Sequence, residues 1–334
     1  MHAQPHTPWR RLLGLGVGLA AALSVLVLAF LWPAVTSEPH DLPVAVAGPP
    51  AAVGPFTRAL EERAPGVFDV VTAQDRSAAV DLVETRETYG AIVLGVQPEI
   101  LTASGGSPLV AQQLGALAPA LQAQLGEPVP VTDLVPLLEG DPRGAILGAV
   151  TFPLVLGGMI GGIAISLTVV GVWRRVTAVV GYSVLGGLAV AVVLQGWFGA
   201  LAGSYAVDAG IIALAILAIA GVIVGCVSVV GRAGIAIGPV LFLLVANPIA
   251  SAAQPWQMLP APWGALGQWM PPGAAAALLR DESYFPRADT TQLWAALAAW
   301  AFLGLLLATV GHFRDAGAAT AAAVEEAAPE LVTV

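Results

Sequence analysis

Hydrophobic residues gather into six long stretches that contain no Asp, Glu or Arg. A helix needs roughly 20 apolar residues to cross the hydrocarbon core of a bilayer, and each stretch approaches or exceeds that length. The sequence therefore predicts six transmembrane helices, with the lipid bilayer as a partner of the chain. The stretches cover residues 12–31, 144–173, 176–201, 210–230, 235–252 and 292–311.

Six arginines flank these stretches, all on one side of the predicted bundle. Cytoplasmic flanks of membrane helices are enriched in positive charge, so this side is predicted to be the cytoplasm. The chain is then a multi-pass plasma-membrane protein with both termini cytoplasmic, including residues 1–11, and with residues 35–145 extracytoplasmic. The six residues are Arg10, Arg11, Arg174, Arg175, Arg232 and Arg314.

The first predicted helix, residues 12–34, has a second interpretation as a cleaved signal peptide. Arg10 and Arg11 resemble the paired arginines of a twin-arginine signal. The apolar run of about 20 residues exceeds the roughly 7–15 of a signal core, and no small-x-small cleavage site follows Trp32. We therefore expect a retained transmembrane helix.

Residues 35–145 alternate strand-like and helix-like segments. Strands are expected at 42–48, 68–72, 89–95, 99–103 and 129–134, and helices from Pro50, over 75–88 and over 109–125. This alternation predicts a small α/β layer with a largely parallel sheet. The predicted fold is an α-helical integral membrane bundle of six spans, with an α/β extracytoplasmic domain inserted between spans one and two. We expect residues 38–142 to fold alone.

The rest of the chain, residues 146–312, forms the predicted five-helix transmembrane region. It is interrupted by a proline-rich hairpin at 253–291, which is expected at the outer surface because tryptophan prefers the membrane interface. The tryptophans of this hairpin are Trp256, Trp263 and Trp269. After Arg314 the chain is alanine-rich and lacks aromatic residues, so 313–334 is predicted to be a disordered cytoplasmic tail.

Composition removes several classes of function. Of the 334 residues, 57% are hydrophobic and none is lysine, so the chain lacks the lysine of a Walker A phosphate loop and of Schiff-base catalysis. One cysteine, Cys226, and four scattered histidines provide neither a disulfide framework nor zinc-ligand spacing. A net charge of −9 disfavours nucleic acid. We expect no enzyme activity, no metal and no cofactor.

Glycines four residues apart within the predicted second span allow close helix approach. They serve either a dimer or moving-gate seam, or packing within one six-helix bundle. Prolines in the predicted fifth span interrupt helical hydrogen bonds and predict a bend. Since no ionisable residue lies inside a predicted span, a proton-driven antiporter is disfavoured. The helix-packing or gating candidates are Gly157, Gly158, Gly161, Gly162, Pro239, Asn247 and Pro248.

The order of parts and several short segments resemble a known family. The segments are YGAIVL (89–94) with Pro98 downstream, LTAS (101–104), VPLLEGDPRG (135–144), PLVLGG (153–158) and LGQWMPPG (266–273). The chain resembles the membrane subunits of type-two ABC exporters, and most nearly the phage-infection-protein-like group. This resemblance implies a permease-like fold that works as a homodimer or heterodimer with a separate ATPase subunit. Amphipathic cytoplasmic coupling helices of such permeases have no counterpart in the sequence before Leu12 or in the short loop at 173–175.

Two functions from different classes remain open on the sequence. The first is an ABC transporter permease-like subunit that exports an apolar or amphipathic substrate, along a dimer interface near the second and fifth spans. The alternative is a non-transporting cell-envelope scaffold or receptor whose extracytoplasmic domain binds a partner. An ATPase chain in the purified complex would distinguish them.

Overall fold

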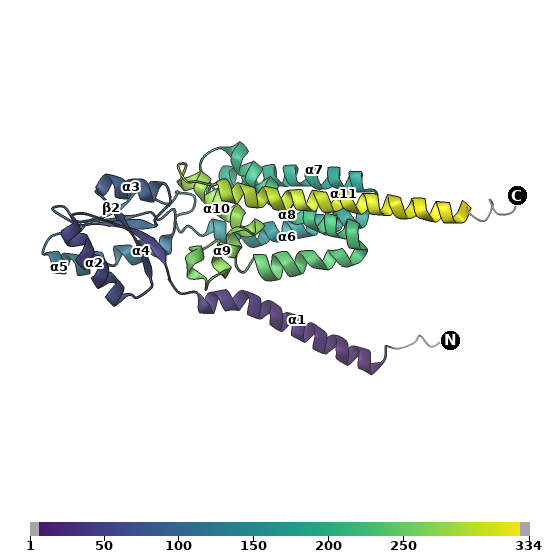
Figure 1. Ribbon diagram of the computed structural model, residues 1–334, viewed down its shortest axis with the longest axis horizontal. Helices are drawn as coiled ribbons and strands as arrows, with labels where there is room; N and C mark the ends of the chain where they lie inside the picture. The colour runs from purple at the N-terminus through teal and green to yellow at the C-terminus, as the bar shows by residue number, and fades with distance from the viewer. Residues whose placement is uncertain (1–6, 328–334) are drawn as a thin grey trace.

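A computed structural model describes residues 7–327 of the chain, with side chains described for residues 7–313. Figure 1 shows an α/β unit at one end and a helical bundle extending from it, while the start of α1 and the end of α11 lie at the opposite end. The chain enters through helix α1 (Trp9–Thr36), builds the α/β unit, and returns to form the bundle. We call the two ends the unit end and the terminal end.

The α/β unit is built on a five-stranded sheet with the order β2-β1-β3-β4-β5. Strand β1 is parallel to β2 and β3, whereas β4 runs antiparallel to β3 and parallel to β5. The largely parallel sheet predicted from the alternating pattern is therefore present. The strands are β1 (Leu42–Ala47), β2 (Phe68–Ala73), β3 (Gly90–Val93), β4 (Glu99–Thr102) and β5 (Val131–Asp133).

Helices cover both faces of the sheet. Val44 faces a core that includes residues of α2 (Pro50–Arg63), α4 (Pro108–Gly115) and α5 (Ala118–Leu125), and the next residue, Ala45, faces a second core with α3 (Arg76–Glu84). The single helix predicted over 109–125 is wrong, because the structure has two. Pro119 lies in the first turn of α5, where the missing N–H costs nothing, but it could not continue α4.

The bundle is organised around α8 (Tyr205–Val230), whose side chains are largely buried. Helices α6 (Ile146–Thr168) and α7 (Val172–Ala191) pack against it, as does α11 (Thr291–Ala327). A π-helix η1 (Val192–Trp197) extends α7. The remaining elements are η2 (Gly231–Ala236), η3 (Pro239–Ala246), η4 (Trp256–Met258), α9 (Trp263–Gln268) and α10 (Pro271–Tyr284).

Five helices within residues 7–327 are long and apolar enough to cross a membrane. They are Trp9–Thr36, Ile146–Thr168, Val172–Trp197, Tyr205–Ala236 and Thr291–Phe313. The predicted fifth span, 235–252, is not among them. It forms the end of η2, the short π-helix η3 and a turn, because Pro239 and Pro248 each remove a helical N–H donor.

Helix α11 continues through Ala327, past the point at which the sequence predicts disorder. The prediction of disorder is therefore wrong for residues 313–327. Alanine has the highest intrinsic helix propensity, so an alanine-rich segment can prolong a helix that is already nucleated. The rest of the predicted tail, 328–334, lies outside the described residues.

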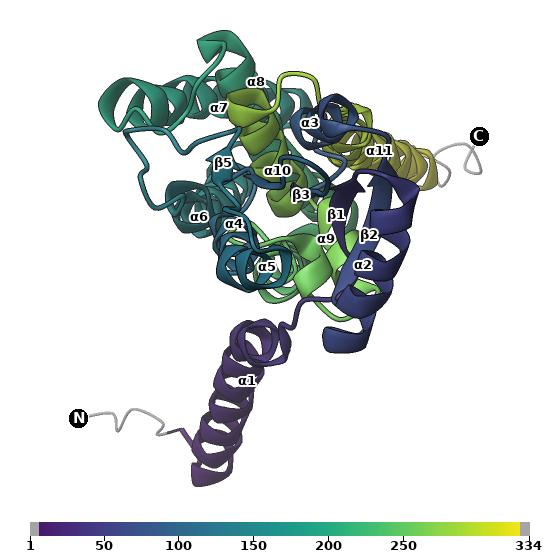
Figure 2. The same ribbon diagram turned by 90° about the vertical axis from the view of Figure 1, so that its left-hand side faces the viewer.

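Helix α1 stands apart from the bundle (Figure 2). Pro33 is its one buried residue among those described. The contacts of α1 lie near its carboxyl end, where the Phe30 ring is 6.0 Å from that of Phe152 and the Trp32 ring 6.0 Å from that of Trp263. From Leu12 to Val25 the helix is largely apolar and exposed at every position.

Candidate functional site

The α/β unit and the bundle share side chains where they meet. Met258 of η4 lies in one core of the unit, and Phe285, just after α10, lies in the other. Between them, the Tyr89 hydroxyl donates a hydrogen bond of 3.0 Å to Oε1 of Gln257. The boundary at residue 145 predicted from sequence therefore leaves out side chains that complete both cores of the unit.

Arg86 reaches from the unit into this junction. It follows α3 and has a left-handed backbone with φ of 61°, a strained conformation for a residue with a side chain. Its guanidinium forms an ion pair with Asp281 of α10 and lies 5.6 Å from the centre of the Phe285 ring. Burial lowers the pKa of Arg86 from its ordinary value. The Arg86–Asp281 pair thus fastens the unit to α10.

Arg280, the neighbour of Asp281 in α10, is buried without a carboxylate partner. Its side chain donates from Nη2 to the carbonyl of Ala252 at 2.8 Å, and it forms no ion pair with any side chain described for residues 7–313. Burial, with a smaller contribution from the charge of Arg86, lowers the pKa of Arg280 to about 10. Arg280 therefore still carries its positive charge at neutral pH.

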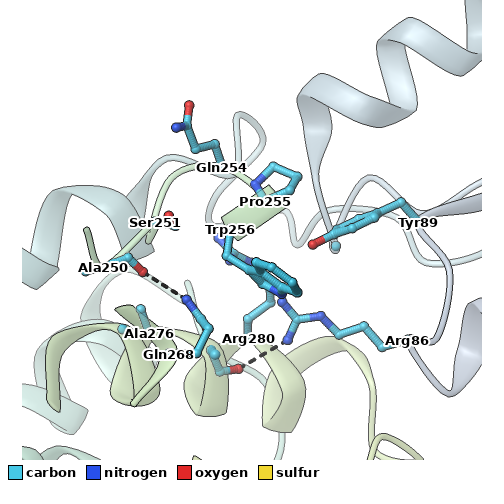
Figure 3. Close-up of a pocket in the computed structure, with 13 residues that line it drawn as sticks. Arg86, Tyr89, Ala250, Ser251, Gln254, Pro255, Trp256, Gln268, Ala276 and Arg280 are labelled. Carbon is cyan, nitrogen blue, oxygen red and sulfur yellow. Dashed lines mark hydrogen bonds between the residues drawn. The ribbon is translucent and has the colours of Figure 1, made fainter. Parts of the chain in front are cut away.

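Both arginines line one small pocket, shown in Figure 3. The pocket has a volume of about 10 Å³, which is room for about one water molecule. Ser251 faces it with a left-handed backbone, φ of 52°, and its buried hydroxyl oxygen has no hydrogen-bond partner among the described residues. Tyr89, Trp256 and Gln268, with its side-chain amide, also line the pocket. We call this site the junction pocket.

A wider cleft of about 550 Å³ adjoins the junction pocket. The two cavities share five wall residues, which are Arg86, Tyr89, Trp256, Gln268 and Ala277. The cleft also reaches Asp289 and Gln292 before α11 and near its start. We call it the outer cleft, and it gives Arg86 a route to molecules from outside.

The chemistry of the junction pocket is that of hydrogen-bond donors. Guanidinium groups, a hydroxyl and an amide suit a negatively charged or strongly polar group. No group of three or more metal-ligating side chains occurs among the described residues. Sequence reasoning missed Arg86 and Arg280 because Arg86 and its partner Asp281 are 195 positions apart, so no local pattern joins them.

The four predicted glycines of α6 lie against helices of the same chain. A Cβ at Gly158 would be 2.9 Å from Ile219, and one at Gly162 would be 2.9 Å from the Ala220 backbone, both in α8. Gly161 faces the Tyr182 ring of α7, and the Gly157 carbonyl accepts a 2.7 Å hydrogen bond from the Tyr182 hydroxyl. These contacts show that the four glycines pack against α7 and α8 of the same chain.

The predicted residues of η3 and the hairpin gather elsewhere. Pro239 begins η3, and Asn247 at its end has a buried Oδ1 without a partner among the described residues. Trp269 accepts a 2.8 Å hydrogen bond from the Trp300 indole through its carbonyl. Trp256 belongs to the junction pocket, and Trp263 and Pro248 belong to a separate apolar cavity.

That apolar cavity lies between α1 and η3 and has a volume of about 260 Å³. We call it the lateral cleft. Its walls carry no charged residue; they are Ala29, Trp32, Leu244, Val245, Pro248, Ile249 and Trp263. Because α1 touches the bundle only near its carboxyl end, the cleft lies between one loosely held helix and the rest of the bundle.

Asp208 corrects the expectation that span interiors carry no ionisable residue. It falls between the predicted spans 176–201 and 210–230, whereas the structure places it in the first turn of α8, where it is fully buried. Neither carboxyl oxygen has a hydrogen-bond partner among the described residues. Glu282 of α10 lies nearby and accepts a 3.3 Å hydrogen bond from the Ser204 amide through Oε1.

Comparisons with known proteins give no relative of this chain. No protein-family model, no curated protein and no solved structure matches it. The function is therefore argued from the cavities, the buried charges and the arrangement of the helices.

Proposed function

We propose that this chain is the membrane subunit of an exporter that moves an apolar or amphipathic substrate outward, with energy from a separate ATPase. The α/β unit is then the inserted extracytoplasmic domain, the unit end faces outward, and both termini lie in the cytoplasm. The chain crosses the plasma membrane six times, and the segment of η2 and η3 makes the fifth crossing.

The placement of the arginines supports this orientation. The rings of Trp173, next to Arg174, and of His312, next to the end of the fifth apolar helix, are 6.1 Å apart. Figure 1 places the start of α1 and the end of α11 at the terminal end, opposite the α/β unit. Positive charge beside the membrane favours the cytoplasmic face, so the terminal end is the cytoplasmic one.

The contacts of η2 and η3 support a sixth crossing. Gly234 in η2 packs against Cys226 near the terminal end of α8, whereas the carbonyl of Ile249, after η3, lies against Gly267 of α9 at the unit end. The segment therefore runs along the bundle from one end to the other, as Figure 1 shows.

The lateral cleft is the observation that carries the proposed function. Its all-apolar walls between α1 and η3 lie within the membrane part of the bundle, where lipid-like molecules are dissolved. Helix α1 is held only at one end, so it can move aside without breaking a packed core. An apolar or amphipathic molecule can therefore enter from the bilayer and leave towards the unit end.

The energy has to come from another chain, because this one has no lysine for a Walker A loop. Helices α6 and α7 are joined at the terminal end by only residues 169–171, which leaves no coupling helix between them. In this proposal the arginines of the terminal end and the continuation of α11 provide the surface for the ATPase. The unpacked face of α1 provides the surface for a second membrane subunit.

The proposal is tested by closing the lateral cleft. In a Cys226→Ala background, Ala29→Cys and Val245→Cys place one thiol on each wall, and a short bifunctional thiol reagent joins them. We expect cross-linking to abolish efflux of a lipophilic dye from cells. In the matched control, Leu19→Cys places a thiol on an exposed part of α1, where no described residue lies within reach for cross-linking. This variant should keep full efflux after the same treatment. Full efflux from the cross-linked pair would overturn the role of the cleft.

A second candidate function is favoured by an apolar groove far from the bundle. This groove, of about 250 Å³, lies between α2 and α5 and includes Phe56, Leu60 and Leu121. It suits a receptor or scaffold whose extracytoplasmic domain binds a partner. If the native complex in mild detergent contains no ATPase, and deletion leaves efflux of lipophilic compounds unchanged, this function replaces the exporter.

A further inference from the structure

We infer that the junction pocket binds a phosphate group, which Arg280 and Arg86 hold between the α/β unit and α10. The binding site itself stands on the contacts below. Its identification as the site for the charged head of an exported amphipathic substrate rests on the proposed function. The lateral cleft has no charged wall residue that could pair with such a head group, whereas the junction pocket has two arginines.

The first argument is the uncompensated charge of Arg280. A guanidinium has five N–H donors, and the structure shows a single hydrogen bond from Arg280, to the carbonyl of Ala252. The nearest carboxylates are already engaged. Asp281 pairs with Arg86, and the two oxygens of Asp141 accept from the amides of Ala145 and Ile146 at 3.0 and 2.9 Å, at the start of α6.

A buried charge without a partner is strongly destabilising, and here a second positive charge, Arg86, adds repulsion. A purely structural arginine at this position would be expected to satisfy several carbonyls or one carboxylate. An anion in the junction pocket would instead neutralise Arg280 and accept its remaining donors. Bidentate contacts of this kind are characteristic of arginine with carboxylate and phosphate.

The second argument is an unpartnered hydroxyl group in the wall of the pocket. The Ser251 hydroxyl oxygen is buried and unpartnered among the described residues, and its residue is held in a left-handed conformation. Arg86 on the opposite wall has the same unusual backbone. Both residues line the junction pocket (Figure 3). Strained backbone conformations cluster at sites such as ligand clamps.

The third argument is size and access. The junction pocket has room for about one small atom group, while the outer cleft beside it has a volume of about 550 Å³. One oxygen of the anion therefore fits between the arginines, and the rest of the ligand extends past Trp256 and Gln268 into the outer cleft. Because Arg86 belongs to the α/β unit and Arg280 to α10, the bound anion joins the two parts.

The experiment measures thermal unfolding of the full-length protein in a neutral detergent. One arm adds inorganic phosphate against chloride at matched ionic strength, and the other adds mixed micelles with phosphatidic acid against diacylglycerol. A ligand of the native state raises the melting temperature as its concentration rises. Stabilisation by phosphate identifies a free anion, and stabilisation by phosphatidic acid alone identifies a lipid head group; either result supports the site.

Substitutions test whether the rise in melting temperature comes from binding at the junction pocket. Arg280→Gln should weaken binding at least tenfold, Arg280→Lys should weaken it less, and Ser251→Ala should weaken it several-fold. The control is Arg287→Gln at the same junction, because Arg287 is exposed and pairs with Asp81 and Glu84. It should bind like the wild type. If Arg280→Gln does not fold, the Ser251→Ala result decides.

The inference is overturned if neither ligand stabilises the wild type, or if Ser251→Ala and folded Arg280→Gln bind as the wild type does. Failure of the proposed function gives a different result. In that case binding and its loss in Arg280→Gln persist, while cross-linking of the lateral cleft leaves efflux unchanged.

Discussion

Asp208 and Asp281 show how differently two buried carboxyl groups behave in this protein. Asp281 faces the Arg86 guanidinium, whereas both oxygens of Asp208 lack a partner among the described residues. A buried carboxylate without hydrogen bonds is so unfavourable that Asp208 is expected to be neutral. The same substitution at the two positions should therefore have very different effects on stability.

We predict that Asp208→Asn changes the free energy of unfolding by less than about 1 kcal/mol, because one neutral polar group replaces another. Asp281→Asn should destabilise the protein by roughly 3–5 kcal/mol, because it leaves the buried Arg86 unpaired. Thermal unfolding in detergent measures both. A large loss in Asp208→Asn would show that its carboxylate is charged and engaged in an interaction.

Acid should weaken the α/β unit through Glu99. Its carboxylate accepts 2.6 Å hydrogen bonds from Arg76 and from the Thr132 hydroxyl, and the Arg76 hydrogen bond lowers the pKa of Glu99. A carboxyl group with a lowered folded pKa contributes stability above its unfolded pKa of about 4.3 and loses it as pH falls through the folded value. Because Arg76 is half exposed, we expect less than about 1 kcal/mol.

The prediction is tested by comparing unfolding of the wild type and Glu99→Gln between pH 7 and pH 3. The difference between them should shrink as the pH falls below about 4, since Gln cannot titrate. Glu61→Gln serves as the matched control, because Glu61 is exposed and bonds only locally, to the Gly66 amide. An unchanged difference over the whole range would contradict the role of Glu99.

At the scale of elements, substitutions of glycine test whether the α6 glycines pack helices within one chain or form a gate. Gly162 faces the Ala220 backbone, whereas Gly210 at the unit end of α8 has nothing within 4 Å of an added Cβ. We expect Gly162→Leu to destabilise the bundle by about 1–3 kcal/mol or more through overpacking. Gly210→Leu should insert and unfold like the wild type. A stable Gly162→Leu variant that has lost only transport would favour the gate.

The elements that the sequence predicted well are those specified by neighbouring residues. Strand β1 and the start of α2 follow from a local apolar run and from Pro49-Pro50. The largely parallel sheet also follows from the alternation of strands and helices. The break between α4 and α5 was missed, and η3 was predicted only as a bent helix, because Pro119 and Pro239 allow either continuation or interruption and packing decides between them.

The candidate site could not be predicted in the same way. The junction pocket is lined by the loop after helix α3 of the α/β unit, the turn at Ser251 and the end of α10. In sequence, Arg280 is one charge among several in an outer segment, and its burial follows only from the docking of the α/β unit. The lateral cleft likewise depends on where α1 stands, which its uniform apolar sequence does not specify.

At the scale of the whole molecule, the α/β unit depends on the hairpin before α11. Met258 and Phe285 complete its two cores, and burying such a side chain contributes about 1.5–3 kcal/mol. Losing both removes about 3–6 kcal/mol from a typical total of 5–15 kcal/mol. We therefore expect the isolated fragment 38–142, which the sequence predicts to fold alone, to be strongly destabilised.

Circular dichroism and amide dispersion of fragment 38–142 measure this dependence. A low melting temperature or a partly unfolded spectrum is expected. Fusing residues 255–286 to the fragment through a flexible linker should restore stability, because it returns both side chains. A fragment that unfolds cooperatively at the temperature of the full-length protein would show that the unit is independent of the hairpin.

The central claim is that the junction pocket lies on the outer side of the membrane, whereas the start of α1 and the end of α11 lie on the cytoplasmic side. Single cysteines in a Cys226→Ala background test it most directly, at three exposed positions: Glu61→Cys on α2, Ala253→Cys after η3, and Arg174→Cys in the first turn of α7. A membrane-impermeant thiol reagent on intact cells should label the first two, and the third only after permeabilisation. Labelling of Ala253→Cys only after permeabilisation would contradict the sixth crossing, and labelling of Arg174→Cys from outside would overturn the orientation.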